Sequence, residues 1–253
     1  MSSFDEIALA YNNSIDWDAR LKREMPFLLE GIPKSGLSRV LDMACGSGRH
    51  SVEMAANGME VVGFDISPVM IDFAKRLAKE RGVAVDFRVA EMMTFRSVIE
   101  EQFDVVICLG NSLALLPNKE TLESVVEDVY SSLSPQGIFI IQVLNFQEIL
   151  LSGFRFFPLK GGVTSSGEEV IFSRLYEHGK GPHSTLVASS FVRQGKEWVT
   201  SISTQPILHT NLEVVKSMLT KAGFGRTEFF SDYNRSPFKP ESSRNLVVNA
   251  TRM

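Results

Sequence analysis

The 253-residue sequence has few cysteines and no long apolar run. Its two cysteines, Cys45 and Cys108, are too few for a disulfide framework and do not have the spacing of metal ligands. No apolar run reaches the length of a membrane span, and the acidic start M-S-S-F-D-E-I-A-L-A-Y lacks the basic region of a signal peptide. We therefore expect a cytoplasmic protein with two reduced thiols, no metal site and no membrane partner.

Basic residues do not outnumber acidic ones. The chain has 26 Lys and Arg against 30 Asp and Glu, a net charge of −4, which argues against a broad nucleic-acid-binding surface. Hydrophobic residues make up 44% and charged residues 22%, the balance of a globular protein. The length suffices for one large α/β domain or for a domain with an insertion.

Apolar runs typical of buried strands alternate with helix-like segments along most of the chain. A first helix is expected over residues 16–30, where Pro26 would bend or break it. Further helices are expected at 49–58, 67–82, 118–133 and 211–224, and strands at 38–44, 59–65, 83–90, 103–110, 137–144, 226–231 and 244–252. This order predicts an α/β fold with a doubly wound seven-stranded sheet that helices cover on both faces.

Residues 152–205 do not continue the alternation of strands and helices. Four strand-like stretches, 154–160, 168–178, 184–193 and 196–203, are separated by Gly161-Gly162, by residues 179–182 and by Gln194-Gly195. They predict a small antiparallel β cap inserted after the fifth strand. The chain then divides into residues 1–37, a ligand-binding core at 38–151, the cap at 152–205, and residues 206–253 that complete the core.

The run V-L-D-M-A-C-G-S-G-R-H at residues 40–50 leads a buried strand into a glycine loop and then into a helix. In a doubly wound sheet this is where a nucleotide binds, and Asp65, at the end of the next strand, is placed to accept ribose hydroxyls. A dinucleotide fingerprint needs a third glycine or alanine, and Ser51 stands there. Asp42 beside the loop suits the cationic, phosphate-free S-adenosylmethionine better than a pyrophosphate. S-adenosylmethionine is therefore the favoured ligand and NAD the alternative.

Four motifs follow one another in order: V-L-D-M-A-C-G-S-G-R-H, F-D-I-S-P-V-M, F-R-V-A-E-M and F-D-V-V-I-C-L-G-N-S. Together they make residues 38–145 resemble the class I S-adenosylmethionine-dependent methyltransferases. Within that class, I-C-L-G-N-S-L-A-L-L-P-N and N-F-Q-E-I-L resemble the glycine/sarcosine N-methyltransferase branch. The resemblance implies a Rossmann-like core, S-adenosylmethionine as cofactor, and a helical lid in residues 1–37.

The resemblance also implies roles for individual residues. Asp65 would hold the ribose, Glu91 would lie near the adenine, and Arg20 would bind the cofactor carboxylate. With Asp42 added, the expected cofactor-binding residues are Tyr11, Arg20, Asp42, Ala44, Gly46, Gly48, Asp65, Ile66, Met70, Glu91, Met92, Leu109 and Gly110. For Tyr11, Arg20 and Glu91 the alternative is an ordinary surface or packing role.

The sequence departs from the glycine-specific members of that branch at the acceptor site. Those enzymes carry an arginine, which grips the substrate carboxylate, where this chain has Leu144, followed by Asn145. A histidine of theirs is replaced by Leu115. Without that bidentate clamp, an acceptor other than glycine, and more apolar, is expected.

Methyl transfer from a sulfonium needs alignment and desolvation more than a fixed catalytic group. Three candidates are nevertheless present: Asn111 to position a nucleophile, and His209 or Tyr176 as a base if the cap folds over the site. A structural role is the alternative for His209, as it is for His178 and His183.

These observations predict an enzyme that transfers a methyl group from S-adenosylmethionine to a nitrogen or oxygen of a small-molecule acceptor. The stretch Asn111-Ser112-Leu113-Ala114 differs from the N-P-P-Y type of base-modifying methyltransferases, so no nucleic-acid partner is expected. Whether the chain forms a homo-oligomer is left open by the sequence. The alternatives are a non-catalytic, S-adenosylmethionine-binding regulatory protein and an NAD-binding oxidoreductase.

Overall fold

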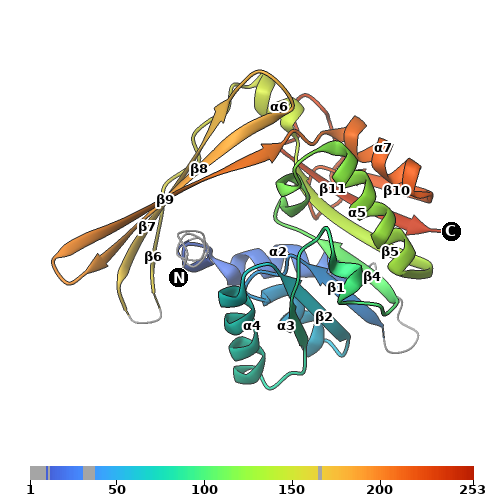
Figure 1. Ribbon diagram of the computed structural model, residues 1–253, viewed down its shortest axis with the longest axis horizontal. Helices are drawn as coiled ribbons and strands as arrows, with labels where there is room; N and C mark the ends of the chain where they lie inside the picture. Colours follow the sequence, from blue (N-terminus) through green and yellow to red (C-terminus); the bar gives the residue numbers. More distant parts are fainter. Residues whose placement is uncertain (1–9, 11, 31–37, 165–166) are drawn as a thin grey trace.

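The computed structural model describes residues 10, 12–30, 38–164 and 167–253 (Figure 1). Its α-helices are α2 (Trp17–Glu30), α3 (Arg49–Ala56), α4 (Pro68–Glu80), α5 (Lys119–Ser132), α6 (Phe146–Leu151) and α7 (Leu212–Ala222). Its strands are β1 (Arg39–Met43), β2 (Glu60–Asp65), β3 (Asp86–Val89), β4 (Phe103–Cys108), β5 (Leu133–Leu144), β6 (Lys160–Val163), β7 (Glu169–His178), β8 (His183–Gln194), β9 (Glu197–Leu208), β10 (Phe224–Phe230) and β11 (Asn245–Arg252). No helix within these ranges is both long and apolar enough to cross a membrane.

Seven strands form one sheet in the order β10-β11-β5-β4-β1-β2-β3. Strand β1 pairs in parallel with both β2 and β4, whereas β11 runs antiparallel to β5 and β10. The predicted seven-stranded α/β fold is confirmed, and the reversed β11 is a feature that the sequence pattern does not specify. Because chain order changes direction at β1, the carboxyl ends of β1 and β4 flank the crevice where such sheets bind ligands.

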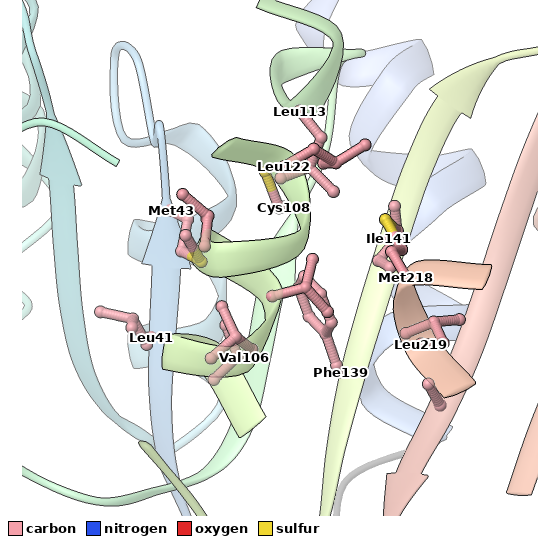
Figure 2. Close-up of a cluster of buried hydrophobic side chains, with 14 of the residues drawn as sticks. Leu41, Met43, Val106, Cys108, Leu113, Leu122, Phe139, Ile141, Met218 and Leu219 are labelled. Atoms are coloured by element: carbon pink, nitrogen blue, oxygen red, sulfur yellow. The ribbon is translucent and has the colours of Figure 1, made fainter. Parts of the chain in front are cut away.

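Alternate residues of the central strands pack on opposite faces of the sheet. Val40 and Val105 lie in a buried cluster with Phe27 of α2. Leu41 and Val106 lie in a second cluster, which α5 and α7 cover on the other face, as Figure 2 shows. Burial on both faces explains why these strands read as continuous apolar runs.

Helix α2 continues through Pro26, so the expected break there is wrong. The first residues after α2 lie outside the described part of the chain. Proline inside a helix costs about 3 kcal/mol. Met25, Phe27 and Leu28 are all buried against the sheet, and each contributes about 1.5–3 kcal/mol on burial. Packing therefore outweighs the loss of one helical hydrogen bond.

The end of α3 and the start of α4 have local capping residues. Ser67 caps α4, its Oγ accepting from the Met70 N–H at 3.3 Å, and Pro68 begins the helix. Helix α3 ends at Asn57, and Gly58 follows in the left-handed region with φ 87°. These ends agree with the helix limits expected at residues 58 and 67.

Four strands form a second, antiparallel sheet in the order β6-β7-β8-β9, which projects from one side of the core (Figure 1). Residues 154–160 were expected to be a strand, but only Lys160 belongs to one, as the first residue of β6, apart from a single bridge between Phe156 and Leu175. The first strand is β6, which contains the pair Gly161-Gly162 that was expected to be a separator. A Cβ on Gly162 would collide with the Asn13 carbonyl, so glycine at this position serves close approach of the N-terminal segment.

The contact of Gly48 with α4 and β3 gives a test of the loop packing. A Cβ on Gly48 would lie 2.6 Å from Phe87 Cζ and 2.7 Å from Ala74 Cβ, and φ is 71°. Gly58 also has positive φ, but nothing lies within 4 Å of its Cβ position. We predict that Gly48→Ala lowers the free energy of unfolding about 1–3 kcal/mol more than Gly58→Ala, because overpacking adds to backbone strain. Equal losses in urea denaturation would contradict the clash.

Candidate functional site

The glycine loop holds its backbone in an unusual conformation at the end of β1. Ala44, Gly46 and Gly48 have φ of 53°, 54° and 71°, in the left-handed region. The Gly46 N–H donates to Asp65 Oδ2 at 2.9 Å, and a Cβ on Gly46 would point into open space. The loop is therefore tied to β2 on one side and leaves bare backbone facing outward on the other.

Asp65 ends β2 and serves as the anchor of this loop. Its Oδ1 accepts from the Ser67 N–H at 3.0 Å while its Oδ2 accepts from Gly46. Burial raises the pKa of Asp65 even though these backbone bonds lower it. Each carboxylate oxygen keeps a second lone pair, so ribose hydroxyls can still donate to it.

The other residues expected around the adenosine follow β2, which Asp65 ends, or the neighbouring strand β3. Ile66 follows Asp65 and is 55% exposed, while Met70 is buried in the first turn of α4. Glu91 is exposed and Met92 is half-buried just after β3, whose end is joined to β2 by the Ala90 N–H donating to the Asp65 carbonyl.

The structure places Asp42 beneath the loop rather than in the cavity. It is 3% exposed and accepts a hydrogen bond from Ser51 Oγ at 2.5 Å. Burial raises the pKa of Asp42 to about 6. Ser51, which interrupts the dinucleotide fingerprint, is thus the partner that joins α3 to β1.

A buried carboxylate, Glu24, joins α2 to the helix that follows the glycine loop. Arg20 Nε lies 3.1 Å from both Glu24 oxygens, Arg23 Nη2 lies 2.8 Å from Oε1, and His50 Nε2 lies 2.9 Å from Oε2. Burial by itself would raise the pKa of Glu24, but the His50 hydrogen bond and the Arg20 charge lower it to about 2. We call these four residues the Glu24 cluster.

The Glu24 cluster brings Arg20 to the end of β4. Arg20 Nη2 would lie 3.7 Å from a Cβ built on Gly110. A second link comes from Asn12, in the segment that precedes α2: its Oδ1 accepts from Ser47 Oγ of the glycine loop at 2.6 Å. Tyr11 lies outside the described residues.

A cavity of about 830 Å³ lies at this edge of the sheet, between α2, the carboxyl ends of the core strands and the cap. It is lined by Ile15, Asp16, Ala19, Arg20, Arg23, Glu24, Gly110, Asn111, Leu115, Gln142, Leu144, Phe157, Lys160, Phe172, Arg174, Tyr176, Leu186, Ala188, Ser203, Gln205, Ile207, Asp232, Tyr233, Asn245 and Val247. Its size and its mixture of apolar walls with a few polar groups are typical of a small-molecule site.

Two amides fix the floor of the cavity. Gln142 Oε1 accepts from the Gly110 N–H at 2.9 Å, and its Nε2 donates to Asn245 Oδ1 at 3.2 Å. Asn111 has φ 68°, and its Oδ1 accepts from the Leu144 N–H at 2.8 Å. Since the oxygen of Asn111 must face that N–H, its NH₂ group is the remaining donor. Leu109, which precedes this turn, is 7% exposed.

The Tyr233 hydroxyl is an unsatisfied group in the wall of the cavity. It is buried, and among the described residues it has no hydrogen-bond partner. Burial raises the pKa of Tyr233, as does the nearby Glu24 charge, so the group is a neutral donor. Its ring packs edge-on against Phe27 at 5.7 Å. A ligand in the cavity can supply the missing partner.

Of the two candidate bases, only Tyr176 lines the cavity, and its ring is packed between Phe146 and Phe157. His209 stacks on Phe146 with ring centroids 4.8 Å apart, and its Nε2 lies 2.8 Å from Ser184 Oγ. Burial lowers the pKa of His209, with the nearby His178 and His183 acting in the same direction.

The contacts of His209 continue through the cap. Ser184 Oγ lies 2.8 Å from His178 Nδ1, and His178 Nε2 lies 2.8 Å from the Phe154 carbonyl. That carbonyl is only an acceptor, so His178 Nε2 donates to it. The chain of hydrogen bonds gives His209 a structural environment at the base of the cap. In the described ranges, no three His, Cys, Asp or Glu side chains are grouped to hold a metal ion.

Several residues of the site carried no signal in the sequence analysis. Glu24 and His50 are 26 positions apart, and each looks like an ordinary helix residue. Gln142 and Tyr233 become site residues only because β5 and the segment after β10 reach the same edge. Glu24 lies on the face of α2 that helix periodicity assigns to the core. A charged residue on that face was the one hint of this site in the sequence.

The Glu24 cluster predicts a specific acid response. The pKa of Glu24 is about 2 instead of 4.5, so its contribution to stability is complete above pH 4.5 and is lost as pH falls toward 2. We predict that Glu24→Gln lowers the free energy of unfolding by about 3 kcal/mol near neutral pH, with the difference from wild type shrinking below pH 4.5. Glu53→Gln, which removes an exposed pair with Arg81, should change it by less than about 1 kcal/mol. A difference that is constant with pH would contradict the ionised state of Glu24.

Comparison with known proteins agrees with this geometry. Residues 40–137 match the sequence profile described as a methyltransferase domain. The chain is 35% identical to the glycine/sarcosine N-methyltransferase of Halorhodospira halochloris over 149 residues, covering 57% of this chain and 54% of that protein. It is 28% identical to the glycine/sarcosine N-methyltransferase of Parasynechococcus marenigrum over 236 residues, covering 91% of this chain and 78% of that protein. The first of these alignments thus spans about half of the relative's length.

A solved structure extends the likeness to the cap. An S-adenosylmethionine-dependent methyltransferase from Clostridium acetobutylicum superposes with a TM-score of 0.78 at 16% identity, over 94% of this chain and 92% of that one. At this identity the match concerns the fold alone. Together with the ordered motifs and the glycine loop, these findings make the chain similar to the class I S-adenosylmethionine-dependent methyltransferases.

Proposed function

We propose that the protein transfers a methyl group from S-adenosylmethionine to a nitrogen or oxygen of a small-molecule acceptor. The observation that carries the proposal is one cavity bounded by the Glu24 cluster, by Gly110 at the end of β4, and by the cap. Such a cavity has a donor side at the core and an acceptor side at the cap.

Residues of the core can bind S-adenosylmethionine, the methyl donor. The left-handed backbone at Gly46 can approach a ligand closely, and Asp65 can accept from both ribose hydroxyls. Arg20 supplies a cation beside Gly110 for the carboxylate of the amino-acid end, and the unpartnered Tyr233 hydroxyl supplies a further donor there. Asp42 supports the loop from below.

When bound, S-adenosylmethionine supplies a methyl group already activated on a sulfonium. The protein then has to align the acceptor and exclude water, and the apolar side chains of Leu115, Leu144 and Ile207 provide the dry wall. The NH₂ group of Asn111 is positioned to orient the acceptor through an oxygen or nitrogen lone pair. Tyr176 is the candidate to receive the acceptor's proton, since His209 does not line the cavity.

We propose an acceptor other than glycine, because the position of the family's carboxylate clamp holds Leu144, whose side chain lines the cavity. The relatives named glycine/sarcosine N-methyltransferase support methylation of a small molecule. The two unpaired thiols, Cys45 and Cys108, favour a reducing compartment such as the cytoplasm.

Calorimetric titration of the purified protein tests the proposal first. We predict micromolar binding of S-adenosylmethionine and S-adenosylhomocysteine, and none of NAD, because the buried carboxylate of Asp42 beneath the loop disfavours a pyrophosphate. Binding of NAD alone would contradict the methyltransferase assignment and favour an oxidoreductase.

Turnover separates an enzyme from a regulatory binding protein. Formation of S-adenosylhomocysteine with a panel of amines and hydroxyl compounds is the expected result. Tight cofactor binding without turnover on any member of a broad panel would favour the non-catalytic alternative.

A further inference from the structure

Two side-chain amides at the floor of the cavity are held in one orientation by a backbone N–H. Gln142 Oε1 accepts from the Gly110 N–H, so the NH₂ group of Gln142 points away from that bond and donates to Asn245 Oδ1 at 3.2 Å. The oxygen of Asn245 is thereby turned toward Gln142, and its own NH₂ group remains as a donor. The main chain at the end of β4 thus decides which face Asn245 offers to a ligand.

A third amide lies on the other side of β5. Asn111 Oδ1 accepts from the Leu144 N–H at 2.8 Å, which leaves the NH₂ group of Asn111 as a donor. Leu144 is the register partner of Asn245 in the β5–β11 ladder, and all three residues line the cavity. Because β5 lies between β4 and β11, the two NH₂ groups flank Leu144. Among the described residues, neither group has a hydrogen-bond partner.

The charged side chains of the cavity wall, in contrast, already have partners within the protein. On the core side, Glu24 is held by Arg20 and Arg23. On the cap side, Lys160 and Arg174 interact with other residues of the chain. A ligand is therefore not needed to neutralise any of these five charges.

The polar side chains of the cap wall that lack a partner are uncharged. Ser203 and Gln205 of β9 line the cavity, and both are half-buried. Within the described part of the chain, neither side chain forms a hydrogen bond. These two groups and the two free NH₂ groups of the core offer a ligand neutral hydrogen bonds rather than free charges.

Asp232 makes the neighbourhood of Asn245 unfavourable for an anion. It follows β10 by two residues, and Phe230 at the end of β10 pairs with Val247, two residues after Asn245. Burial would raise the pKa of Asp232, but hydrogen bonds from Ser236 and from the backbone of the same loop lower it, so the carboxylate is ionised at neutral pH. Asp232 and Asn245 both line the cavity. A second carboxylate bound there would be repelled.

We infer that the methyl acceptor carries an uncharged carbonyl group, as in a carboxamide or an ester, and that the Asn245 NH₂ group donates to its oxygen. The inference rests on the proposed methyltransferase function and adds its substrate class. The amide oxygens of this wall are turned toward protein donors, so the wall suits a group that only accepts better than a hydroxyl, which must also donate. Asn111 orients the nucleophilic atom, and Asn245, across Leu144, selects the group attached beside that atom.

Matched probes test the inference in the complex with S-adenosylhomocysteine. Two sets of three amines share an apolar body and differ in the neighbouring group, which is a carboxamide, a carboxylate or absent. The first set is phenylalaninamide, phenylalanine and 2-phenylethylamine, and the second is leucinamide, leucine and 3-methylbutylamine. We predict that in at least one set the carboxamide binds the wild-type complex about tenfold more tightly than both other members in calorimetry, because it satisfies the Asn245 donor without adding a charge.

Variants assign that preference to one side chain. Asn245→Leu and Asn245→Asp both remove the NH₂ donor, the first without adding a charge and the second while keeping an oxygen that accepts from Gln142. In each, the carboxamide should lose its advantage over the unsubstituted amine, while wild-type affinity for S-adenosylhomocysteine shows that the variant is folded. Asn234→Asp is the matched control and should keep the preference, because Asn234 is exposed in the loop after β10 and does not line the cavity.

The outcomes separate the two proposals. If S-adenosylhomocysteine fails to bind the wild-type protein, the proposed function fails and the inference fails with it. If S-adenosylhomocysteine binds but neither set favours the carboxamide, or if Asn245→Leu keeps the preference, the inference is overturned and the proposed methyltransferase function stands.

Discussion

The buried carboxylate of Glu24 is the interaction on which the site depends. Taking a carboxylate out of water costs several kcal/mol unless nearly every lone pair is satisfied. Here Arg20, Arg23 and His50 satisfy it from two helices, and the pKa of Glu24 falls to about 2 as a result. The same bonds hold α2 against α3 and place Arg20 beside Gly110. Arg20, Arg23 and Glu24 of this cluster line the cavity, so one of its walls depends on these bonds.

The order of the strands explains why the other parts meet this wall. Chain direction changes at β1, so the loops after β1, β2 and β4 open at one edge of the sheet. Strand β5 ends beside β4, and the cap is inserted shortly after it, which carries β7 to β9 over the same edge. One wall of the cavity therefore comes from the core sheet and α2, and the other comes from the inserted cap. The first wall suits a common donor, and the second can vary with the acceptor.

The elements that could be predicted from the sequence are those with local causes. The central strands are apolar because both faces are buried, and Ser67, Gly58 and Gly82 mark helix ends through capping or positive φ. Pro26 misled the prediction because local propensity was overruled by burial of its neighbours. The first cap strand was misplaced because Gly162 serves a close approach to Asn13 rather than a turn.

The parts of the site that could not be predicted depend on contacts between distant segments. The bond between Asn12 and Ser47, the Glu24 cluster and the chain from Gly110 through Gln142 to Asn245 each join different elements. No periodicity encodes them. Motif order predicted roles for Gly46, Asp65 and Gly110, and the resemblance near the N-terminus predicted one for Arg20. The inward position of Arg174 became visible only when the register of the cap was known.

We propose that the Glu24 cluster places Arg20 to bind the amino-acid end of the donor. The most direct measurement compares the affinities of S-adenosylhomocysteine and 5′-methylthioadenosine, which lacks that end, for the wild-type protein and for Arg20→Met. The account predicts that the substitution weakens S-adenosylhomocysteine about tenfold or more and leaves 5′-methylthioadenosine unchanged, because only the former offers a carboxylate to the guanidinium. Equal weakening of both ligands, or of neither, would contradict the account.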